Sequence, residues 1–277
     1  MKKNKWTIGT FLTFSILVIF LIIFIYPLIW LFINSFKDNS EIFVNPWGLP
    51  SSWSLRNYVK SFQIGNIGIY FINSVFITIV SVTIGVMLSC MASYGIKRMK
   101  WKMSKFVYLL FLVGISIPSF AVIVPLFAMC NWLKIINTYV SIILVHIVFS
   151  FPISIFILSG FFSTIPRELE EAAIIDGCTI LEVFFRIILP ISTSSIVIVA
   201  VINFLRIWND LLFAQVFLSD RNMMPLTVGL ITFKDAYTTD YTGMIAAVLM
   251  AITPSIIMYV FLQNEITEGI TLGAVKG

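Results

Sequence analysis

The sequence predicts an all-α polytopic membrane protein with six transmembrane helices. Of the 277 residues, 59% are hydrophobic and only 11% are charged, and the mean hydropathy is +1.01. Soluble domains contain about 45–50% apolar and about 25% charged residues, so this composition excludes a soluble globular enzyme and a disordered chain. The second observation is a set of six apolar segments, each of the length of about 20 residues that a membrane-spanning helix needs.

The third observation is that charge is almost absent from these segments, since Arg206 and Asp210 are the only formally charged side chains within them. The first segment follows three lysines, as a signal peptide would, but its apolar run is too long, and we expect a retained helix. We expect residues 1–277 to form a single transmembrane domain. The predicted spans are 8–33, 70–96, 106–129, 139–161, 193–214 and 242–262.

The distribution of lysine and arginine predicts the orientation of the chain. Eleven of them lie in the N-terminal segment, in residues 97–105, in loop 162–192 and in the C-terminal tail, whereas six lie in the loops on the other side. Cytoplasmic loops carry the excess of positive charge. The sequence therefore predicts a multi-pass protein with both termini in the cytoplasm, and the net charge of +5 is explained by topology without nucleic-acid binding.

Two further classes of site are excluded by composition. His146 is the only histidine, so a metal site with several histidines cannot form. Cys90, Cys130 and Cys178 lie far apart without a CxxC spacing, which argues against a zinc ribbon and a disulfide scaffold. We interpret all four residues as packing residues and expect neither a metal nor a cofactor in this chain.

Loop 162–192 is too long and too patterned for a simple connector. Pro166 suits a first helical turn, and the glutamates that follow it are favoured at a helix N-terminus. Gly177 can end this helix with a left-handed residue, and a second amphipathic stretch leads to Pro190. An acidic helix is repelled by anionic headgroups, so we favour docking to a protein over a position on the lipid surface. The glutamates are Glu168, Glu170 and Glu171.

This loop resembles the EAA loop of the permeases of binding-protein-dependent ABC importers. The matching residues, in chain order, are Glu171-Ala172-Ala173, then Gly177, then Ile187-Ile188-Leu189-Pro190. The resemblance covers nearly the whole chain and is strongest to the smaller of the two permeases in maltose-type carbohydrate systems. Supporting motifs are Ser35-Phe36-Lys37, Pro46-Trp47-Gly48-Leu49-Pro50, Leu55-Arg56-Asn57-Tyr58, Trp208-Asn209-Asp210 and Gly273-Ala274-Val275-Lys276-Gly277.

The resemblance implies a type I ABC importer permease fold and half of the translocation pathway for a sugar in a bacterial cytoplasmic membrane. It implies four kinds of partner: a larger second permease, two copies of an ATPase that binds ATP and Mg, an extracytoplasmic solute-binding protein and the lipid bilayer. It also implies that the loop forms a coupling helix on the ATPase, with Glu171 in a polar contact, Ala172 and Ala173 in a close contact, and Gly177 at the bend. The residues assigned to ATPase coupling are Glu171, Ala172, Ala173, Asp176, Gly177, Leu189 and Pro190, with tail residues Val275, Lys276 and Gly277.

The chain carries no G-x-x-x-x-G-K-[ST] phosphate loop. We therefore expect it to be no enzyme, so that an ATPase driving transport must be another polypeptide.

After Ser195, the fifth predicted span contains four polar residues: Asn203, Arg206, Asn209 and Asp210. Spacings of three and four place three of them near one helical face, where Arg206 and Asp210 can pair. Ionisable residues in a span indicate a pathway or a gate, but an ion pair that merely holds helices together remains the alternative.

Two other functions are weighed against the importer. An ion-coupled secondary carrier needs buried carboxylates to bind its coupling ion, and the spans contain only Asp210. A purely structural scaffold has no use for the acidic Ala-Ala-Gly loop.

Overall fold

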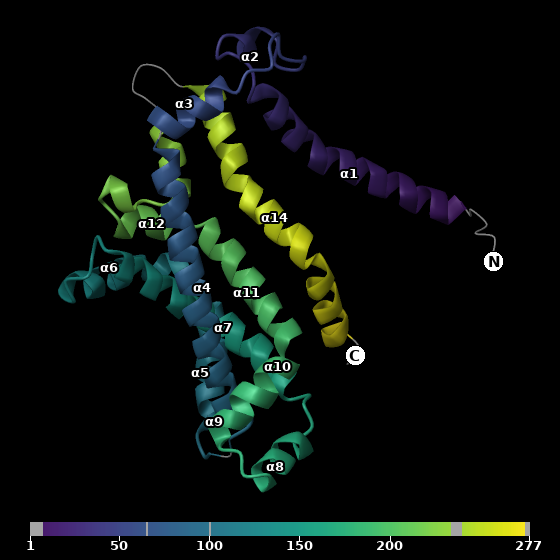
Figure 1. Cartoon of the computed structure of the whole chain (residues 1–277), viewed down its shortest axis with the longest axis vertical. Helices are drawn as coiled ribbons and strands as arrows, with labels where there is room; N and C mark the ends of the chain where they lie inside the picture. Colours follow the sequence, from purple (N-terminus) through teal and green to yellow (C-terminus); the bar gives the residue numbers. More distant parts are fainter. Residues whose placement is uncertain (1–7, 65, 100, 234–239, 275–277) are drawn as a thin grey trace. The chain divides into compact units, whose positions relative to one another are not determined.

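The structure is a computed structural model, and all the regular secondary structure of its described residues is helical (Figure 1). The described residues are 8–64, 66–99, 101–233 and 240–274.

The chain packs as two compact units, which are described separately. The first unit contains Met1–Gly68 and Gly229–Ile252, and the second contains Ile69–Val228 and Thr253–Gly277. The sequence predicts one transmembrane domain, whereas the packing divides the chain within helix α4 and again within helix α14.

The first unit is held together by polar contacts beyond the end of a long apolar helix. Asn57 Nδ2 donates hydrogen bonds to the carbonyl oxygens of Ser35 (2.7 Å) and Lys37 (2.8 Å), and Ser61 Oγ donates to Gly243 O at 2.9 Å. These bonds fix the chain after the first helix to two later helices. The elements of this unit are α1 (Ile8–Asn34), α2 (Glu41–Val44), α3 (Arg56–Ile64), η4 (Leu230–Phe233) and the first part of α14 (Tyr241–Ala274).

The second unit contains the remaining helices and loop 162–192. Its long helices are α4 (Ile67–Lys97), α7 (Tyr139–Phe162) and α11 (Thr193–Trp208). The shorter elements are α5 (Ser104–Ser116), η1 (Ser119–Val122), α6 (Ile123–Trp132), α8 (Glu168–Ile175), α9 (Ile180–Val183), the π-helical η2 (Phe184–Ile188), α10 (Leu189–Ile191), α12 (Leu212–Phe217), η3 (Arg221–Met223) and α13 (Leu226–Gly229).

Four helices among the described residues are long and apolar enough to span a membrane, and the number rises to six if each of two bent helix pairs is one span. The four are α1, α4, α7 and α14, at the places of four predicted spans. The two bent pairs are Ser104–Ser116 with Ser119–Trp132, at 99°, and Ile180–Ile191 with Thr193–Trp208, at 78°.

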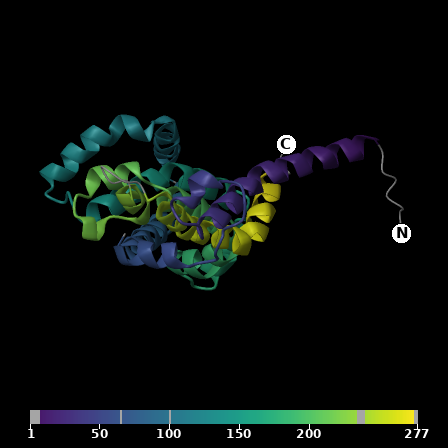
Figure 2. The same ribbon diagram turned by 90° about the horizontal axis from the view of Figure 1, so that it is seen from above.

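The predicted span 106–129 corresponds to a bent pair of helices, because the chain breaks between α5 and α6 (Figure 2). Pro118 has no backbone N–H, and it forces the preceding Ile117 into an extended conformation (φ −79°, ψ 115°). The chain therefore cannot continue the α5 helix and turns into η1.

The predicted span 193–214 also differs, since its helix ends at Trp208 and a new helix begins at Leu212. The side chain of Asp210 accepts from the backbone N–H groups of Phe213 (3.4 Å) and Ala214 (3.0 Å). A side-chain acceptor at this place starts a new helix by satisfying its first donors.

Two apolar clusters form the core of the second unit. One contains Leu158 and Phe162 of α7 with Phe184 and Ile188 of loop 162–192. The other contains Ile142 of α7 with residues of α11 and α12. The helix α7 belongs to both clusters, so it connects loop 162–192 to the break after α11.

Candidate functional site

The helix α8 occupies the place predicted for the coupling helix. Its first turn carries Glu168, Glu170 and Glu171, which favour a helix N-terminus. Its end is a Schellman motif, in which Gly177 N donates to Ile174 O and Cys178 N donates to Ala173 O. Gly177 has φ +88°, so the predicted left-handed bend is present.

The structure separates the two alanines of the EAA pattern. Ala172 is exposed, as are Glu171 and Asp176, whereas Ala173 is buried against the core cluster of Phe162 and Phe184. The assignment of both alanines to a partner contact stays a prediction. Successive helical residues point in directions about 100° apart, and of the two only Ala172 is exposed on this chain. Ala173 instead lets α8 lie close to its own chain.

Arg98, which directly follows α4, fixes the start of α8. Its guanidinium forms an ion pair with Glu170 and donates to the carbonyl oxygens of Ile165 (2.9 Å), Phe162 (3.2 Å) and Pro166 (3.4 Å). The side chain is only 4% exposed. Because Phe162 is the last residue of α7, this one side chain connects the ends of α4 and α7 to α8. In the sequence, Arg98 is only one of the positive charges that predict the orientation of the chain.

The second half of the loop is built on a capping box at Thr179. Thr179 Oγ1 accepts from Glu182 N, and Glu182 Oε2 accepts from Thr179 N at 2.9 Å. The hydrogen bonds that Thr179 N and Thr179 Oγ1 donate to the Glu182 carboxylate, together with the nearby Arg186, lower the pKa of this carboxyl. The helix then passes through η2 into α10, where Leu189 is half-buried and Pro190 is exposed in the first turn.

The tail residues Val275, Lys276 and Gly277 lie outside the described residues. Their assignment to an ATPase contact stays a prediction.

Three of the four polar residues predicted in the fifth span lie against α7. Asn203 Nδ2 donates to Ser154 Oγ at 2.8 Å, and Arg206 Nη2 donates to both Ser150 Oγ and His146 O at 2.9 Å. Residues 146, 150 and 154 are one turn apart on α7, so these contacts form a polar ladder between two helices. The exposed Asn209 does not join it and donates to Leu205 O of its own helix.

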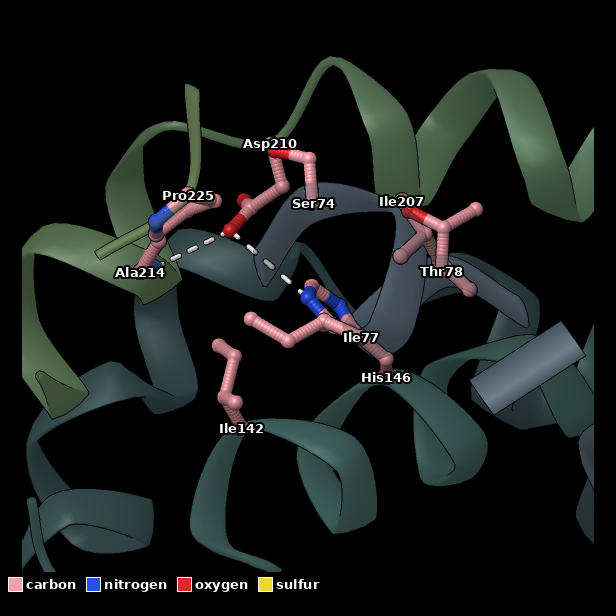
Figure 3. A pocket seen from close by; sticks show the side chains of 9 residues that line it. All are labelled: Ser74, Ile77, Thr78, Ile142, His146, Ile207, Asp210, Ala214 and Pro225. Atoms are coloured by element: carbon pink, nitrogen blue, oxygen red, sulfur yellow. Dashed lines mark hydrogen bonds and ion pairs between the residues drawn. The ribbon is translucent and has the colours of Figure 1, made fainter. Parts of the chain in front are cut away.

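Asp210 extends the ladder at the break after α11 (Figure 3). Its Oδ2 lies 3.9 Å from His146 Nε2, and both residues line a cavity of about 10 Å³, which is roughly the space of one water molecule. The expected Arg206–Asp210 ion pair is absent from the described contacts, because the guanidinium is directed to α7. Sequence analysis missed His146 as part of this cluster, since nothing in an isolated histidine indicates which helix faces it.

No group of three or more His, Cys, Asp or Glu residues that could hold a metal ion occurs in the described part of the chain. The described residues thus present an exposed face of α8 and a buried polar contact between α7 and α11.

Comparisons with known proteins agree with this architecture. Residues 81–264 match the family described as binding-protein-dependent transport system inner membrane component. The chain is 36% identical over 275 residues to the probable ABC transporter permease protein YurM of Bacillus subtilis, covering 99% of this chain and 91% of that protein. It is 35% identical over 257 residues to the arabinooligosaccharides transport system permease protein AraQ of Halalkalibacterium halodurans, covering 91% of each.

Among solved structures, the fold is similar to that of a chain of a bacterial ABC transporter involved in the import of the acidic polysaccharide alginate. The TM-score is 0.83 at 19% sequence identity, over 95% of this chain and 99% of that one. The family match covers well over half of the chain, and the relatives extend it to nearly the whole length. The protein thus belongs to the family of binding-protein-dependent transport system inner membrane components, the permease subunits of ABC transporters.

Proposed function

We propose that this chain is one of two permease subunits in an importer of sugars or oligosaccharides. The family membership supports the importer, and the arabinooligosaccharide permease among the relatives supports the carbohydrate class. The chain itself forms half of the pathway and catalyses no covalent reaction. The ion-coupled carrier is not favoured, because the relatives are ABC permeases and Asp210 is the only carboxylate of the predicted spans.

The observation that carries the mechanism is the way α8 is presented. Glu171 and Ala172 are exposed, while Ala173 and Glu170 attach the same helix to α4 and α7. A partner bound to the exposed side therefore moves a helix that is attached to two candidate spans. Two copies of a separate ATPase, which bind ATP and Mg, supply this movement, and α8 transmits it.

The remaining parts of the complex follow from the same proposal. A larger second permease completes the pathway, and a solute-binding protein delivers the sugar from outside. Both termini of this chain lie in the cytoplasm, and the tail at 275–277 extends toward the ATPase pair.

For the four polar residues of the fifth predicted span, a pathway or gate role stays a prediction. The contacts of Asn203 and Arg206 with α7 support the alternative, in which they hold two helices together. The exposed Asn209 is the member of the set best placed to face a pathway.

The importer is tested by purifying the complex from its native membrane in mild detergent and identifying the co-purifying proteins. We expect a P-loop ATPase, a second permease and a solute-binding protein. Recovery of this chain alone, in a preparation that keeps other complexes intact, would favour the ion-coupled secondary carrier over the importer.

The docking role of α8 is tested by Glu171→Lys, which reverses the charge of an exposed side chain. We expect sugar uptake and co-purification of the ATPase to be lost while the amount of this chain in the membrane is unchanged. Asp38→Lys is the control, since it makes the same change at a side chain that is 70% exposed in the first unit. Normal uptake by Glu171→Lys contradicts the assignment.

A further inference from the structure

An apolar groove lies between the C-terminal end of α4 and the start of α5. It has a volume of about 450 Å³, and its lining includes Ala92, Gly95, Val107 and Phe111. A Cβ atom added to Gly95 would meet nothing within 4 Å. This part of the groove is therefore open space.

A cationic pocket of about 450 Å³ adjoins the groove. Lys97, Lys102 and Arg167 line it together with Ser104, and no carboxylate is among the described residues of its lining. Lys97 Nζ lies 4.0 Å from the centre of the Tyr108 ring, which holds its side chain in place. Three cations without a carboxylate in the lining favour an anionic occupant.

The groove and the pocket are adjacent, because Ile96, Met99 and Trp101 line both. Trp101 is 43% exposed, and its indole N–H donates to Gly95 O at 2.8 Å. Tryptophan is enriched where a membrane meets water, which places the junction of the two cavities at the level of the headgroups.

We propose that the groove and the pocket together bind one anionic phospholipid. The groove takes an acyl chain, and Lys97, Lys102 and Arg167 take the phosphate of the headgroup. Basic pockets beside transmembrane helices bind anionic headgroups in this way. A free phosphate would use only the cationic pocket, whereas a phospholipid uses both cavities and their common wall.

The site adjoins the coupling helix. Arg167 lines the pocket. Its carbonyl oxygen accepts hydrogen bonds from Glu170 N and Glu171 N, both at 3.0 Å, in the first turn of α8. A headgroup held by Arg167 therefore contacts the start of the helix to which the ATPase is proposed to bind. Placing the site in the inner leaflet rests on the proposed orientation, but the binding itself does not.

The test is native mass spectrometry of the purified intact transporter, titrated with phosphatidylglycerol and with phosphatidylcholine of the same chain length. We expect phosphatidylglycerol to bind more tightly, and Lys102→Gln combined with Arg167→Gln to weaken it by about tenfold or more, from the loss of two cations. Lys105→Gln removes an exposed charge of α5 that lies outside the lining and serves as the control. Gly95→Leu fills the groove and should weaken both lipids.

Four results would overturn the proposal. Equal binding of the two lipids removes the headgroup assignment, and equal effects of the Lys105 variant and the double variant remove the pocket. Displacement of phosphatidylglycerol by millimolar inorganic phosphate identifies a free-anion site instead. If no lipid binds and Lys102→Cys cross-links to another subunit, a protein segment covers this surface. All these readouts are independent of sugar uptake, so their failure leaves the proposed transport function standing.

Discussion

At the residue scale, Arg98 shows how one charge can position a functional element. Its guanidinium contacts one carboxylate and three carbonyl oxygens in a place where its side chain is 4% exposed. A planar group with five donors suits such a set of acceptors better than an ammonium group does. The pair specifies where α8 begins relative to α4 and α7.

We expect Arg98→Ala to destabilise the protein by about 3–5 kcal/mol, because it leaves the Glu170 carboxylate, itself 13% exposed, without its partner. The measurement is the midpoint of thermal unfolding of the purified complex. Arg186→Ala is the matched control, since its ion pair with Glu182 is 73% and 39% exposed and solvent screens such pairs. Similar shifts in the two variants would mean that the Arg98 pair contributes no more than a surface pair.

The polar residues of α11 likewise have partners that the sequence alone could not identify. Spacing alone placed Asn203, Arg206 and Asp210 near one face, and all three lie against α7. It could not identify Ser150 and Ser154 as their partners, because those residues lie more than 45 positions away and are ordinary helix serines. The Arg206–Asp210 pair that the spacing allows does not form for the same reason, because the Arg206 guanidinium donates to acceptors on α7 and not to the nearby carboxylate.

At the element scale, the end of α8 depends on a backbone conformation. Gly177 has φ +88°, and a Cβ atom there would meet nothing within 4 Å. Any penalty for a side chain is therefore conformational and not steric crowding by neighbours. L-residues pay roughly 1–2 kcal/mol in the left-handed region.

Gly177→Ala should consequently destabilise the protein by about 1 kcal/mol, whereas Gly160→Ala should stabilise it by up to about 1 kcal/mol. Gly160 lies inside α7, and a Cβ atom there also meets nothing within 4 Å. The pair therefore separates backbone strain from packing. Chemical or thermal unfolding of both variants decides, and shifts of the same sign would refute the explanation.

The broken spans also belong to the element scale. Pro118 lies within the third predicted span, but the sequence alone did not give the 99° bend between α5 and α6. Likewise, Asp210 was interpreted as a pathway charge although it also caps α12. A hydropathy window detects length and apolarity, and it is blind to a change of helix direction inside an apolar run.

At the scale of the whole molecule, much apolar surface stays uncovered by this chain. None of the most apolar window of α1 is buried within the structure, as expected of a helix that faces lipid or another subunit. In water such a surface would mark an aggregation hazard. The chain is therefore built to be completed by a membrane and by partner chains.

The proposed orientation predicts which side chains water-soluble reagents reach. In a background without Cys90, Cys130 and Cys178, a membrane-impermeant maleimide should label Arg221→Cys in intact cells. It should label Lys105→Cys only after permeabilisation, because positively charged segments are retained in the cytoplasm. Both side chains are exposed, so accessibility within the protein does not distort the comparison. The reverse labelling pattern would mean that the topology is the opposite of the proposed one.

The sequence by itself determined the membrane class, the number of apolar segments and the acidic helix that ends at Gly177. These features depend on local composition and on backbone preferences that act within one or two turns. Only the tertiary structure decided that Ala173 faces inward, that Arg98 holds α8 and that α7 accepts the polar side chains of α11. The contacts of Arg98 and of the α11 side chains join residues 49 to 72 positions apart, and no local pattern encodes which distant surface a helix will meet.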